Sequence, residues 1–314
     1  MTTVLITHPA FAAHDTGPHH PERAERMRVI DKVLEHEVYQ SLIRHEAPLR
    51  DDDETYIVKA HRNEHLEHLR RVAAGHGHGS THIDGDTVVS PGTWEAARRA
   101  VGAGLDAVDL VMSKDAANVF CQVRPPGHHA ESNVAMGFCL FNNIAIAAHY
   151  ARAKHGAERV AVVDFDVHHG NGTQEIFWSD KNMFYGSTHQ MPLFPGTGDV
   201  SETGAGNIFN APLRAGDGRE RFEEAFRERI LQPLHNFSPD IVFISAGFDA
   251  HRDDPLGGMA LVEADYIWAT ELLAENARRH ANGRVVSMLE GGYNLTALAR
   301  SVAVHVKTLM ETGR

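Results

Sequence analysis

A run of apolar residues in the middle of the chain ends in a polar cluster. Residues 160–163 read V-A-V-V, a composition that suits a strand buried on both faces of a parallel sheet. Asp164, Asp166 and His168 follow at alternate positions, so they project the same way if the extended conformation continues over residues 160–167. Removing two carboxylates and an imidazole from water is costly, and a bound cation would offset that cost. The pattern therefore predicts a metal site at the end of this strand.

Three further polar clusters follow apolar runs that read as strands. His128 and His129 follow residues 118–123, Asp249 follows residues 241–245, and Tyr293 follows residues 285–289. The carboxyl ends of parallel strands meet at one edge of a sheet, where open α/β sheets bind their ligands. We therefore expect the four clusters to converge.

These residue types suit metal-assisted hydrolysis. Asp166, His168 and Asp249 would supply three ligands and leave a fourth position open, as catalytic zinc requires. His128 and His129 would transfer protons, and the Tyr293 hydroxyl could donate to a developing oxyanion. A lone Asp-x-His pair, an isolated histidine or a buried tyrosine is more often structural. The adjacent histidines beside a metal site favour function here.

Strands that alternate with helices of crossover length would position these clusters. The expected strands cover residues 3–7, 118–123, 160–167, 183–187, 241–245 and 285–289. The expected helices cover residues 21–39, 61–74, 91–112 (N-cap Ser90), 138–155, 219–235, 262–280 and 295–310, and another begins at residue 173. Residues 42–49 are ambiguous, residues 51–54 fit a helix start or a turn, and residues 83–87 and 191–206 read as loops. We predict an α/β fold with a parallel central sheet flanked by helices on both faces, and a single domain over residues 1–314.

Composition narrows the choice of partners and location. The formal net charge of −12 argues against nucleic acid or an anionic membrane as the main partner. No apolar run approaches the roughly 20 residues that span a bilayer, and the amino terminus lacks the features of a signal peptide. Cys121 and Cys139 read as buried free thiols. We therefore expect a cytoplasmic enzyme. His76 and His78 lie in a glycine-rich loop with no rigid support, which argues against a metal site there.

The motifs that contain these residues resemble the histone deacetylase superfamily of zinc amidohydrolases, especially its class II branch and bacterial relatives. They are R-P-P-G-H-H-A (124–130), G-F-C (137–139), D-F-D-V-H-H-G-N-G (164–172), F-P-G-T-G-D (194–199), G-F-D-A-H (247–251), D-P-L-G-G (254–258) and E-G-G-Y (290–293). The resemblance extends over nearly the whole chain, from H-H-P-E-R (19–23) onward. It implies an arginase-deacetylase fold with a narrow channel that leads to one zinc ion.

By this resemblance the chain binds two kinds of metal ion. The positions that match the zinc ligands are Asp166, His168 and Asp249. The family also binds a monovalent cation, usually potassium, beside the zinc and partly through backbone carbonyls. The positions that match this second site are Asp164, Asp166, His168, Ser187 and Thr188. Ferrous iron would fit the zinc ligands as well as zinc does.

The resemblance also implies roles in catalysis. His129 matches the general base that later acts as an acid, and His128 matches a histidine that acts mainly through its charge. Asp164 matches the carboxylate that orients His128. Asn171 stands where some members carry aspartate, so His129 is expected to be less readily protonated than beside a carboxylate. Tyr293 matches the tyrosine that polarises the acyl carbonyl.

The remaining matches belong to the substrate channel. Phe138, next to Gly137, and Phe194 match aromatic walls that grip the acyl-lysine stem. Asp86 matches a rim aspartate that binds backbone amides of the substrate. Leu256 stands at the channel-wall position where a polyamine-selective relative carries glutamate. This difference weakens a polyamine assignment, although an acid from another loop, such as Asp84 or Glu131, could compensate.

The sequence therefore predicts a zinc-dependent amidohydrolase that removes acetyl or other acyl groups from acetyl-lysine or a related acetylated amine. The alternatives are an acetylpolyamine or small-acylamide hydrolase and a catalytically silent acyl-lysine binding module. Intact catalytic residues argue against the silent module. A binuclear manganese ureohydrolase is disfavoured because Gly170 stands where a second metal needs aspartate. A homodimer and a homotetramer both remain open.

Overall fold

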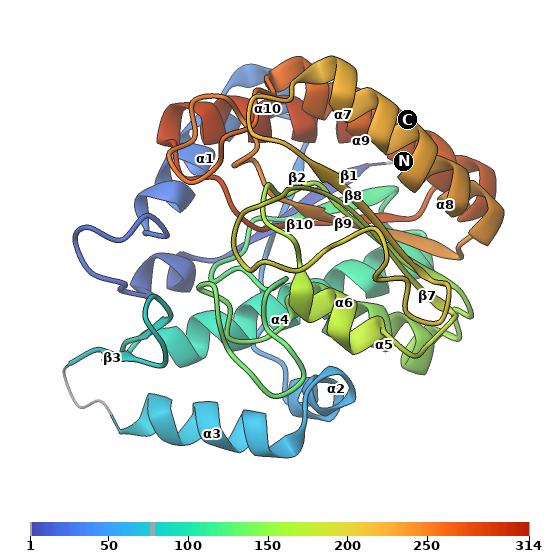
Figure 1. Ribbon diagram of the computed structural model, residues 1–314. Coiled ribbons are helices and arrows are strands. Elements are labelled where there is room, and N and C mark those ends of the chain that lie inside the picture. The colour runs from blue at the N-terminus through green and yellow to red at the C-terminus, as the bar shows by residue number, and fades with distance from the viewer. Residues whose placement is uncertain (1, 76–78, 314) are drawn as a thin grey trace.

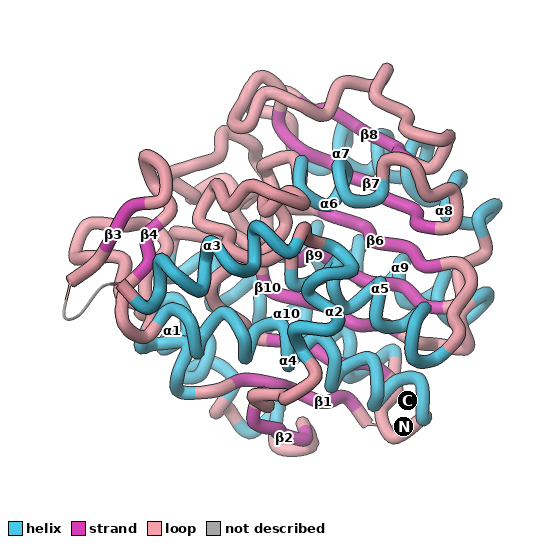
Figure 2. Tube along the Cα trace, turned by 90° about the horizontal axis from the view of Figure 1, so that it is seen from below, coloured by secondary structure: helices cyan, strands magenta, loops and turns pink. Residues whose placement is uncertain are grey.

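The computed structural model describes residues 2–75 and 79–313, and its centre is a sheet of eight parallel strands (Figure 1). The strand order is β2-β1-β5-β10-β9-β6-β7-β8, which Figure 2 shows from β2 at the bottom to β8 at the top. The strands are β1 (Thr3–Thr7), β2 (Ile43–Glu46), β5 (Asn118–Cys121), β6 (Val160–Asp164), β7 (Met183–Gln190), β8 (Ile208–Leu213), β9 (Ile241–Ala246) and β10 (Val285–Leu289). A short antiparallel pair, β3 (Thr81–His82) and β4 (Val88–Val89), forms a separate sheet. His76 and His78 lie outside the described residues.

Helices cover both faces of the sheet, which confirms the predicted fold class (Figure 1). One layer contains α1 (Glu25–Leu34), α7 (Arg219–Ala225), α8 (Gln232–Phe237), α9 (Glu263–His280) and α10 (Leu295–Thr312). The other contains α4 (Thr93–Ser113), α5 (Asn143–His155) and α6 (Asn171–Phe177), with α2 (Asp53–Ala60) and α3 (Asn63–Ala74) packed outside it. A turn of π-helix, Phe226–Leu231, joins α7 to α8, and short 3₁₀ helices cover Pro9–Ala13 and Glu37–Tyr39. Among the helices described, none combines the length and the apolar character that a membrane crossing requires.

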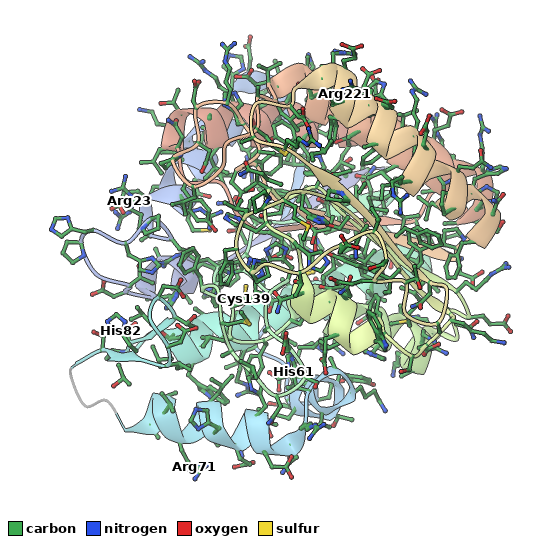
Figure 3. The ribbon with its side chains drawn as sticks, in the orientation of Figure 1. Arg23, His61, Arg71, His82, Cys139 and Arg221 are labelled. Atoms are coloured by element: carbon green, nitrogen blue, oxygen red, sulfur yellow. The ribbon has the colours of Figure 1, made fainter. Side chains whose placement is uncertain are left out.

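The central strands are buried because helices pack on both sides of them. Every residue of β5, β6, β7, β9 and β10 is buried. Their apolar runs therefore fit a parallel sheet with no solvent-facing side. Cys121 and Cys139 are buried free thiols, as predicted, and Figure 3 shows Cys139 near the middle of the molecule.

The two edge strands are the elements that the sequence pattern describes least well. Residues 42–49, which were ambiguous in the sequence, contain the mostly exposed strand β2 (Ile43–Glu46). β8 was not predicted, because its sequence I-F-N-A-P-L contains Asn210 and Pro212 after a glycine-rich loop. A proline has no backbone N–H to donate, and an edge strand tolerates it because one side has no ladder partner.

Several helices begin later than predicted, among them α5, α1 and α4. The helix expected from residue 138 begins at Asn143, because Gly137 and Phe138 take positive φ angles of 56° and 69° and the Asn142 side chain caps the helix by accepting from the Ala145 N–H. The helix expected from residue 21 begins at Glu25. The helix expected from residue 91 begins at residue 93. Ser90 does not cap it, because the Ser90 hydroxyl accepts the N–H of residue 15 instead.

A buried ion network ties the segment before α1 to the loops behind the site. Glu22 is fully buried and accepts hydrogen bonds from Arg124 Nε (2.5 Å) and Arg26 (3.2 Å). Arg124 also donates to the carbonyls of Phe11 and His14. Burial alone would raise the pKa of Glu22, but the positive charges of Arg124, His14 and Arg26 outweigh it and lower the pKa to about 2. The network therefore holds a charged carboxylate inside the protein.

Replacing Glu22 with glutamine is expected to lower the free energy of unfolding by about 3–5 kcal/mol, because two buried arginines lose their counter-charge. The folded-state pKa lies below the ordinary glutamate value of 4.5, so the contribution is present above pH 4.5 and is lost as the pH falls towards 2. Urea unfolding at several pH values measures both effects. Glu25→Gln is the matched control, because its pair with Arg28 is exposed and should contribute about 0.5 kcal/mol or less. Equal effects of the two substitutions would contradict the prediction.

Candidate active site and metal centre

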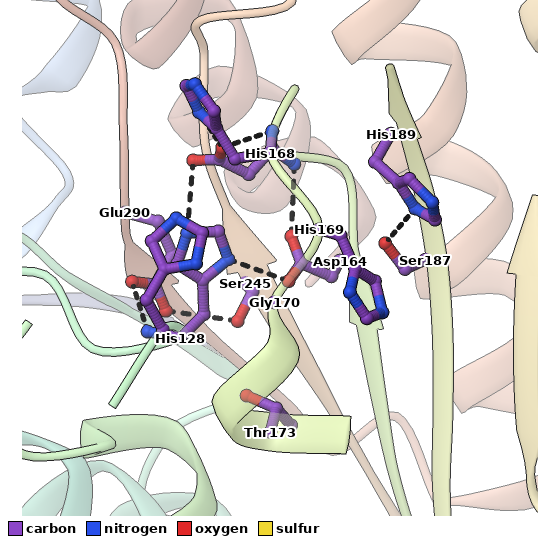
Figure 4. Close-up of polar contacts among 12 residues, drawn as sticks. His128, Asp164, His168, His169, Gly170, Thr173, Ser187, His189, Ser245 and Glu290 are labelled. Atoms are coloured by element: carbon purple, nitrogen blue, oxygen red, sulfur yellow. Dashed lines mark hydrogen bonds and ion pairs between the residues drawn. The ribbon is translucent and has the colours of Figure 1, made fainter. Parts of the chain in front are cut away.

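Four neighbouring strands at the centre of the sheet end in polar side chains. β5, β10, β9 and β6 lie side by side in that order. The segments that follow these strands carry, in the same order, His128 and His129; Tyr293; Asp249; and Asp164, Asp166 and His168. Hydrogen bonds and a shared cavity connect the four segments, so the structure brings the predicted clusters together. Figure 4 shows His128 and Asp164 joined by one of these bonds.

Asp166, His168 and Asp249 form the one group of three or more metal-ligating side chains found among the described residues. One ligand atom from each lies within 4.8 Å of the others. His168 Nδ1 is 3.2 Å from Asp166 Oδ1 and 3.0 Å from Asp249 Oδ2. All three residues are buried. One imidazole nitrogen and two carboxylates are a donor set that suits zinc or another divalent transition metal.

Hydrogen bonds from backbone N–H groups hold these carboxylates in place. The chain bends after Asp164 and does not continue as a strand. β6 ends at Asp164, so the expected strand over residues 160–167 is too long by three residues. The Asp164 and Asp166 carboxylates accept the N–H groups of residues 166 and 168, which turns the chain while keeping the side chains together. Asp166 Oδ2 accepts the Gly291 N–H, and Asp249 Oδ1 accepts the Val167 N–H, each at 2.8 Å.

The electrostatics of this group favour a bound cation. Burial would lower the pKa of His168, but its hydrogen bonds to Asp166 and Asp249 outweigh burial and raise the pKa to about 10. Burial and the negative charge of Asp166 raise the pKa of Asp249 to about 7. Burial would raise the pKa of Asp166, but the charges of His128 and His168 outweigh burial and lower it, so only Asp249 lacks a compensating positive charge. A divalent cation would supply that charge.

His128 and His129 lie side by side in different electrostatic surroundings. Their ring centroids are 4.0 Å apart. His128 Nδ1 is 2.9 Å from Asp164 Oδ2, and the charges of Asp164, Asp166 and Glu290 outweigh burial and raise the pKa of His128 to about 10. Burial and the charges of His128 and His168 lower the pKa of His129 well below its usual value. At neutral pH, His128 is therefore a cation and His129 a neutral base.

Tyr293 is buried and its turn is held from several sides. Its backbone N–H donates to Asp254 Oδ2 (2.6 Å), which also accepts from the Asn294 N–H (3.1 Å). Its ring packs edge-on against Phe138 and lies under the Arg26 guanidinium, 5.1 Å from the ring centroid. Burial, with the charge of Asp249, raises the pKa of Tyr293 well above its usual value. The hydroxyl therefore stays protonated and is available as a donor.

A cavity of about 670 Å³ connects these groups to the surface. The side chains predicted to act in catalysis or metal binding that line it are His129, His168 and Tyr293. The predicted channel residues that line it are Gly137, Phe138, Phe194, Leu256 and Asp86. A side chain at Gly137 would collide with the His129 ring, because its Cβ would lie 2.6 Å from His129 Cδ2. The structure therefore places every predicted channel residue on the cavity wall.

The rim of the cavity is held by hydrogen bonds to the Asp86 loop. His20 Nδ1 accepts the Glu22 N–H, so its Nε2–H donates to the Asp86 carbonyl at 2.9 Å. Asp84 Oδ1 accepts the N–H groups of Asp86 and Thr87. Asp84 and Glu131 do not appear among the residues that line the cavity, so neither supplies the extra channel acid considered above.

The predicted potassium positions lie beside the metal triad on adjacent strands. Asp164 on β6 pairs with Ser187 on β7. The Ser187 hydroxyl contacts His189 Nδ1 at 2.9 Å, and the buried Thr188 hydroxyl has no hydrogen-bond partner. His189 Nε2 faces the Gly198 carbonyl, so His189 donates there and accepts from the Ser187 hydroxyl. Ser187 Oγ therefore contacts His189 and also interacts with the Tyr185 side chain, whereas the Thr188 hydroxyl stays without a partner.

Comparison with known proteins decides the family. Residues 20–309 match the model of the histone deacetylase domain. The chain belongs to the histone deacetylase family. A "Probable deacetylase" of Archaeoglobus fulgidus is 36 % identical over 94 % of this chain and 82 % of the relative. A "Histone deacetylase-like amidohydrolase" of Pseudomonas aeruginosa is 36 % identical over 91 % of this chain and 74 % of the relative.

A solved structure supports the same histone deacetylase fold. The crystal structure of the HDA15 HD domain superposes with a TM-score of 0.92 at 35 % identity, covering 99 % of this chain and 88 % of that one. The central parallel sheet with helices around it is therefore the arginase-deacetylase fold that the motifs implied.

Sequence reasoning missed one buried acid at the centre of this histone deacetylase site. Glu290 accepts hydrogen bonds from the N–H groups of Gly127 (2.7 Å) and His128 (3.1 Å) and from the Ser245 hydroxyl (3.0 Å) (Figure 4). Burial raises the pKa of Glu290 to about 7, despite the charge of His128. Glu290 therefore holds the backbone at Gly127 and His128, directly before His129. A glutamate at the end of an apolar strand, directly before Gly-Gly-Tyr, could have indicated this role.

Proposed function

We propose that this protein is a zinc-dependent amidohydrolase that removes acetyl or related acyl groups from acetyl-lysine. One observation carries the proposal: a neutral histidine (His129), the Tyr293 side chain and one residue of the three-ligand metal group (His168) line one channel, and the cationic His128 lies directly beside His129. The family membership supports hydrolysis of an amide. The zinc dependence and the substrate are the parts that require experiment.

Asp166, His168 and Asp249 would hold the zinc, with ferrous iron as an alternative. When bound, such an ion supplies Lewis-acid polarisation of a carbonyl oxygen and lowers the pKa of water. Asp164, Ser187 and Thr188 would hold potassium beside it, supported by the pairing of Asp164 with Ser187 on adjacent strands and by the unpartnered Thr188 hydroxyl.

The protein's own groups supply proton transfer and charge stabilisation. His129 accepts a proton from the attacking water and returns it to the leaving amine, because it is neutral and lines the channel. The His128 cation, held by Asp164, stabilises the negative charge that develops during the reaction. The Tyr293 hydroxyl donates to the oxyanion.

The channel mouth favours a peptide-like acetyl-lysine over a polyamine. Asp86 is the one carboxylate that lines the cavity within the described part of the chain. Its exposed position at the rim suits binding of backbone amides. Leu256 presents an apolar wall where a polyamine would need a second anion.

We also propose that residues 1–314 form one domain, since a single apolar core extends from Val4 to Leu309. The buried free thiols support a cytoplasmic location.

The proposal is tested by assaying acetate release from an acetyl-lysine peptide and from an acetylated polyamine. The protein is assayed zinc-loaded, metal-stripped and as Asp166→Ala. We expect metal-dependent release, with kcat/KM at least about tenfold higher for the peptide, because an apolar wall gives a second ammonium group no counter-charge. A higher value for the polyamine would reverse the substrate assignment. Absence of release from both, with zinc bound stoichiometrically, would favour the silent binding module.

A further inference from the structure

A chain of two hydrogen bonds leads from His129 away from the channel. His129 Nδ1 is 2.9 Å from Asn171 Oδ1, and Asn171 Nδ2 donates to Glu131 Oε1 at 2.8 Å. Asn171 is buried, whereas Glu131 is partly exposed and does not appear among the cavity residues. Glu131 therefore reaches the catalytic histidine through one intervening amide.

The orientation of the Asn171 amide decides which nitrogen of His129 carries its proton. An asparagine side chain has nearly the same shape with its oxygen and nitrogen exchanged, so its neighbours must select the orientation. The Glu131 carboxylate only accepts hydrogen bonds and therefore selects the NH₂ group, which leaves Oδ1 facing His129. Because Oδ1 only accepts, the His129 proton lies on Nδ1, and Nε2 keeps a free lone pair.

The opposite orientation would disable the base. An Asn171 NH₂ group that faced His129 would require an unprotonated Nδ1, which moves the proton to Nε2. The sulfur of Met136, 3.4 Å from Asn171 Nδ2, is a weak acceptor and selects the orientation far less strongly. The strong selection therefore comes from Glu131.

The backbone of Glu131 is fixed, so its carboxylate is directed at Asn171. His61 Nε2 accepts the Asn142 N–H, and its Nδ1–H donates to the Glu131 carbonyl at 2.9 Å. The Glu131 N–H donates to the Val134 carbonyl at 2.9 Å. We propose that Glu131 is a positioning residue that fixes the tautomer of His129 through Asn171. The effect on catalysis rests on the proposed function, in which His129 Nε2 accepts the proton.

The test compares Glu131→Gln with the wild-type holoenzyme. A glutamine can present either oxygen or NH₂ to Asn171, so the selection is lost, and we expect kcat to fall about tenfold with KM little changed. Glu175→Gln is the matched control, because the Glu175 carboxylate accepts hydrogen bonds from Ser132 of the same loop rather than from the Asn171 amide. We expect its kcat to stay within about twofold of wild type.

The same substitution in an Asn171→Asp variant separates a positioning role of Glu131 from a general loss of structure. Aspartate at position 171 accepts from His129 Nδ1–H without needing Glu131 to orient it. Adding Glu131→Gln to Asn171→Asp should therefore cause no further loss. An equal tenfold loss in both backgrounds would overturn the proposal.

Imidazole ¹⁵N shifts give a readout that does not depend on turnover. In the wild type, His129 should show a protonated Nδ1 and an unprotonated Nε2, and in Glu131→Gln the two forms should mix. Unchanged shifts would overturn the proposal even if activity fell. An inactive wild-type protein with the expected shifts would refute the proposed function alone.

Discussion

Replacing Tyr293 with phenylalanine is expected to lower kcat by about 10²- to 10³-fold while KM changes by less than about threefold, as for loss of one oxyanion donor. The hydroxyl remains protonated at neutral pH because burial raises its pKa. The ring contacts with Phe138 and Arg26 persist in the variant, so the loss is confined to the hydroxyl. Steady-state kinetics with the acetyl-lysine peptide, together with calorimetric binding of an uncleaved analogue, separates turnover from affinity.

Tyr266→Phe is the matched control. Tyr266 is a second buried tyrosine whose hydroxyl has no hydrogen-bond partner within the described structure, and it does not line the cavity. Its removal should leave kcat within about twofold of wild type. If Tyr293→Phe behaved like this control, the hydroxyl could not be the oxyanion donor.

Replacing Asp249 with asparagine is expected to remove the bound metal and to lower kcat/KM by at least about 10³-fold. A bound metal contributes several kcal/mol of transition-state stabilisation, which corresponds to a factor of this order. The variant should not be less stable than the metal-free wild type. Burial and the charge of Asp166 raise the pKa of Asp249 to about 7, so the charged carboxylate is unfavourable there without a cation.

Metal content by elemental analysis, kcat/KM and the unfolding midpoint are measured on the same preparations. Asp253→Asn removes an exposed carboxylate from the same segment, 57 % accessible, and should leave all three values unchanged. Full activity in an Asp249→Asn protein without bound metal would exclude this metal centre. A large loss of stability would mean that Asp249 serves the fold rather than the metal.

The sequence predicted the central strands and the convergence of the site because both follow from local rules. Buried parallel strands require continuous apolar runs, and residues 118–121, 241–246 and 285–289 provide them. The polar residues that follow such runs must lie at one sheet edge. Asp166, His168 and Asp249 were therefore grouped correctly even though their backbone bends after Asp164.

The elements that were misplaced depend on contacts distant in sequence. Residues 138–142 have a helical composition, but Phe138 turns into the channel wall and its N–H donates to the Thr87 hydroxyl. Residues 21–24 look like a helix start, but the buried partners of Glu22 come from α1 and from the loop after β5. Periodicity within a window of residues cannot detect such partners.

The position of β10 in the sheet has a consequence for synthesis of the chain. Among the described strands it is the last to be synthesised, yet it lies between β5 and β9. Until residues 285–289 are available, these strands can form at most two partial sheets, β2-β1-β5 and β9-β6-β7-β8, with the buried strands β5 and β9 left as exposed edges. Unpaired edges of this kind promote aggregation during slow assembly of parallel sheets. Both halves of the site therefore stay separate, and both edges need protection, until residues 285–289 have been synthesised.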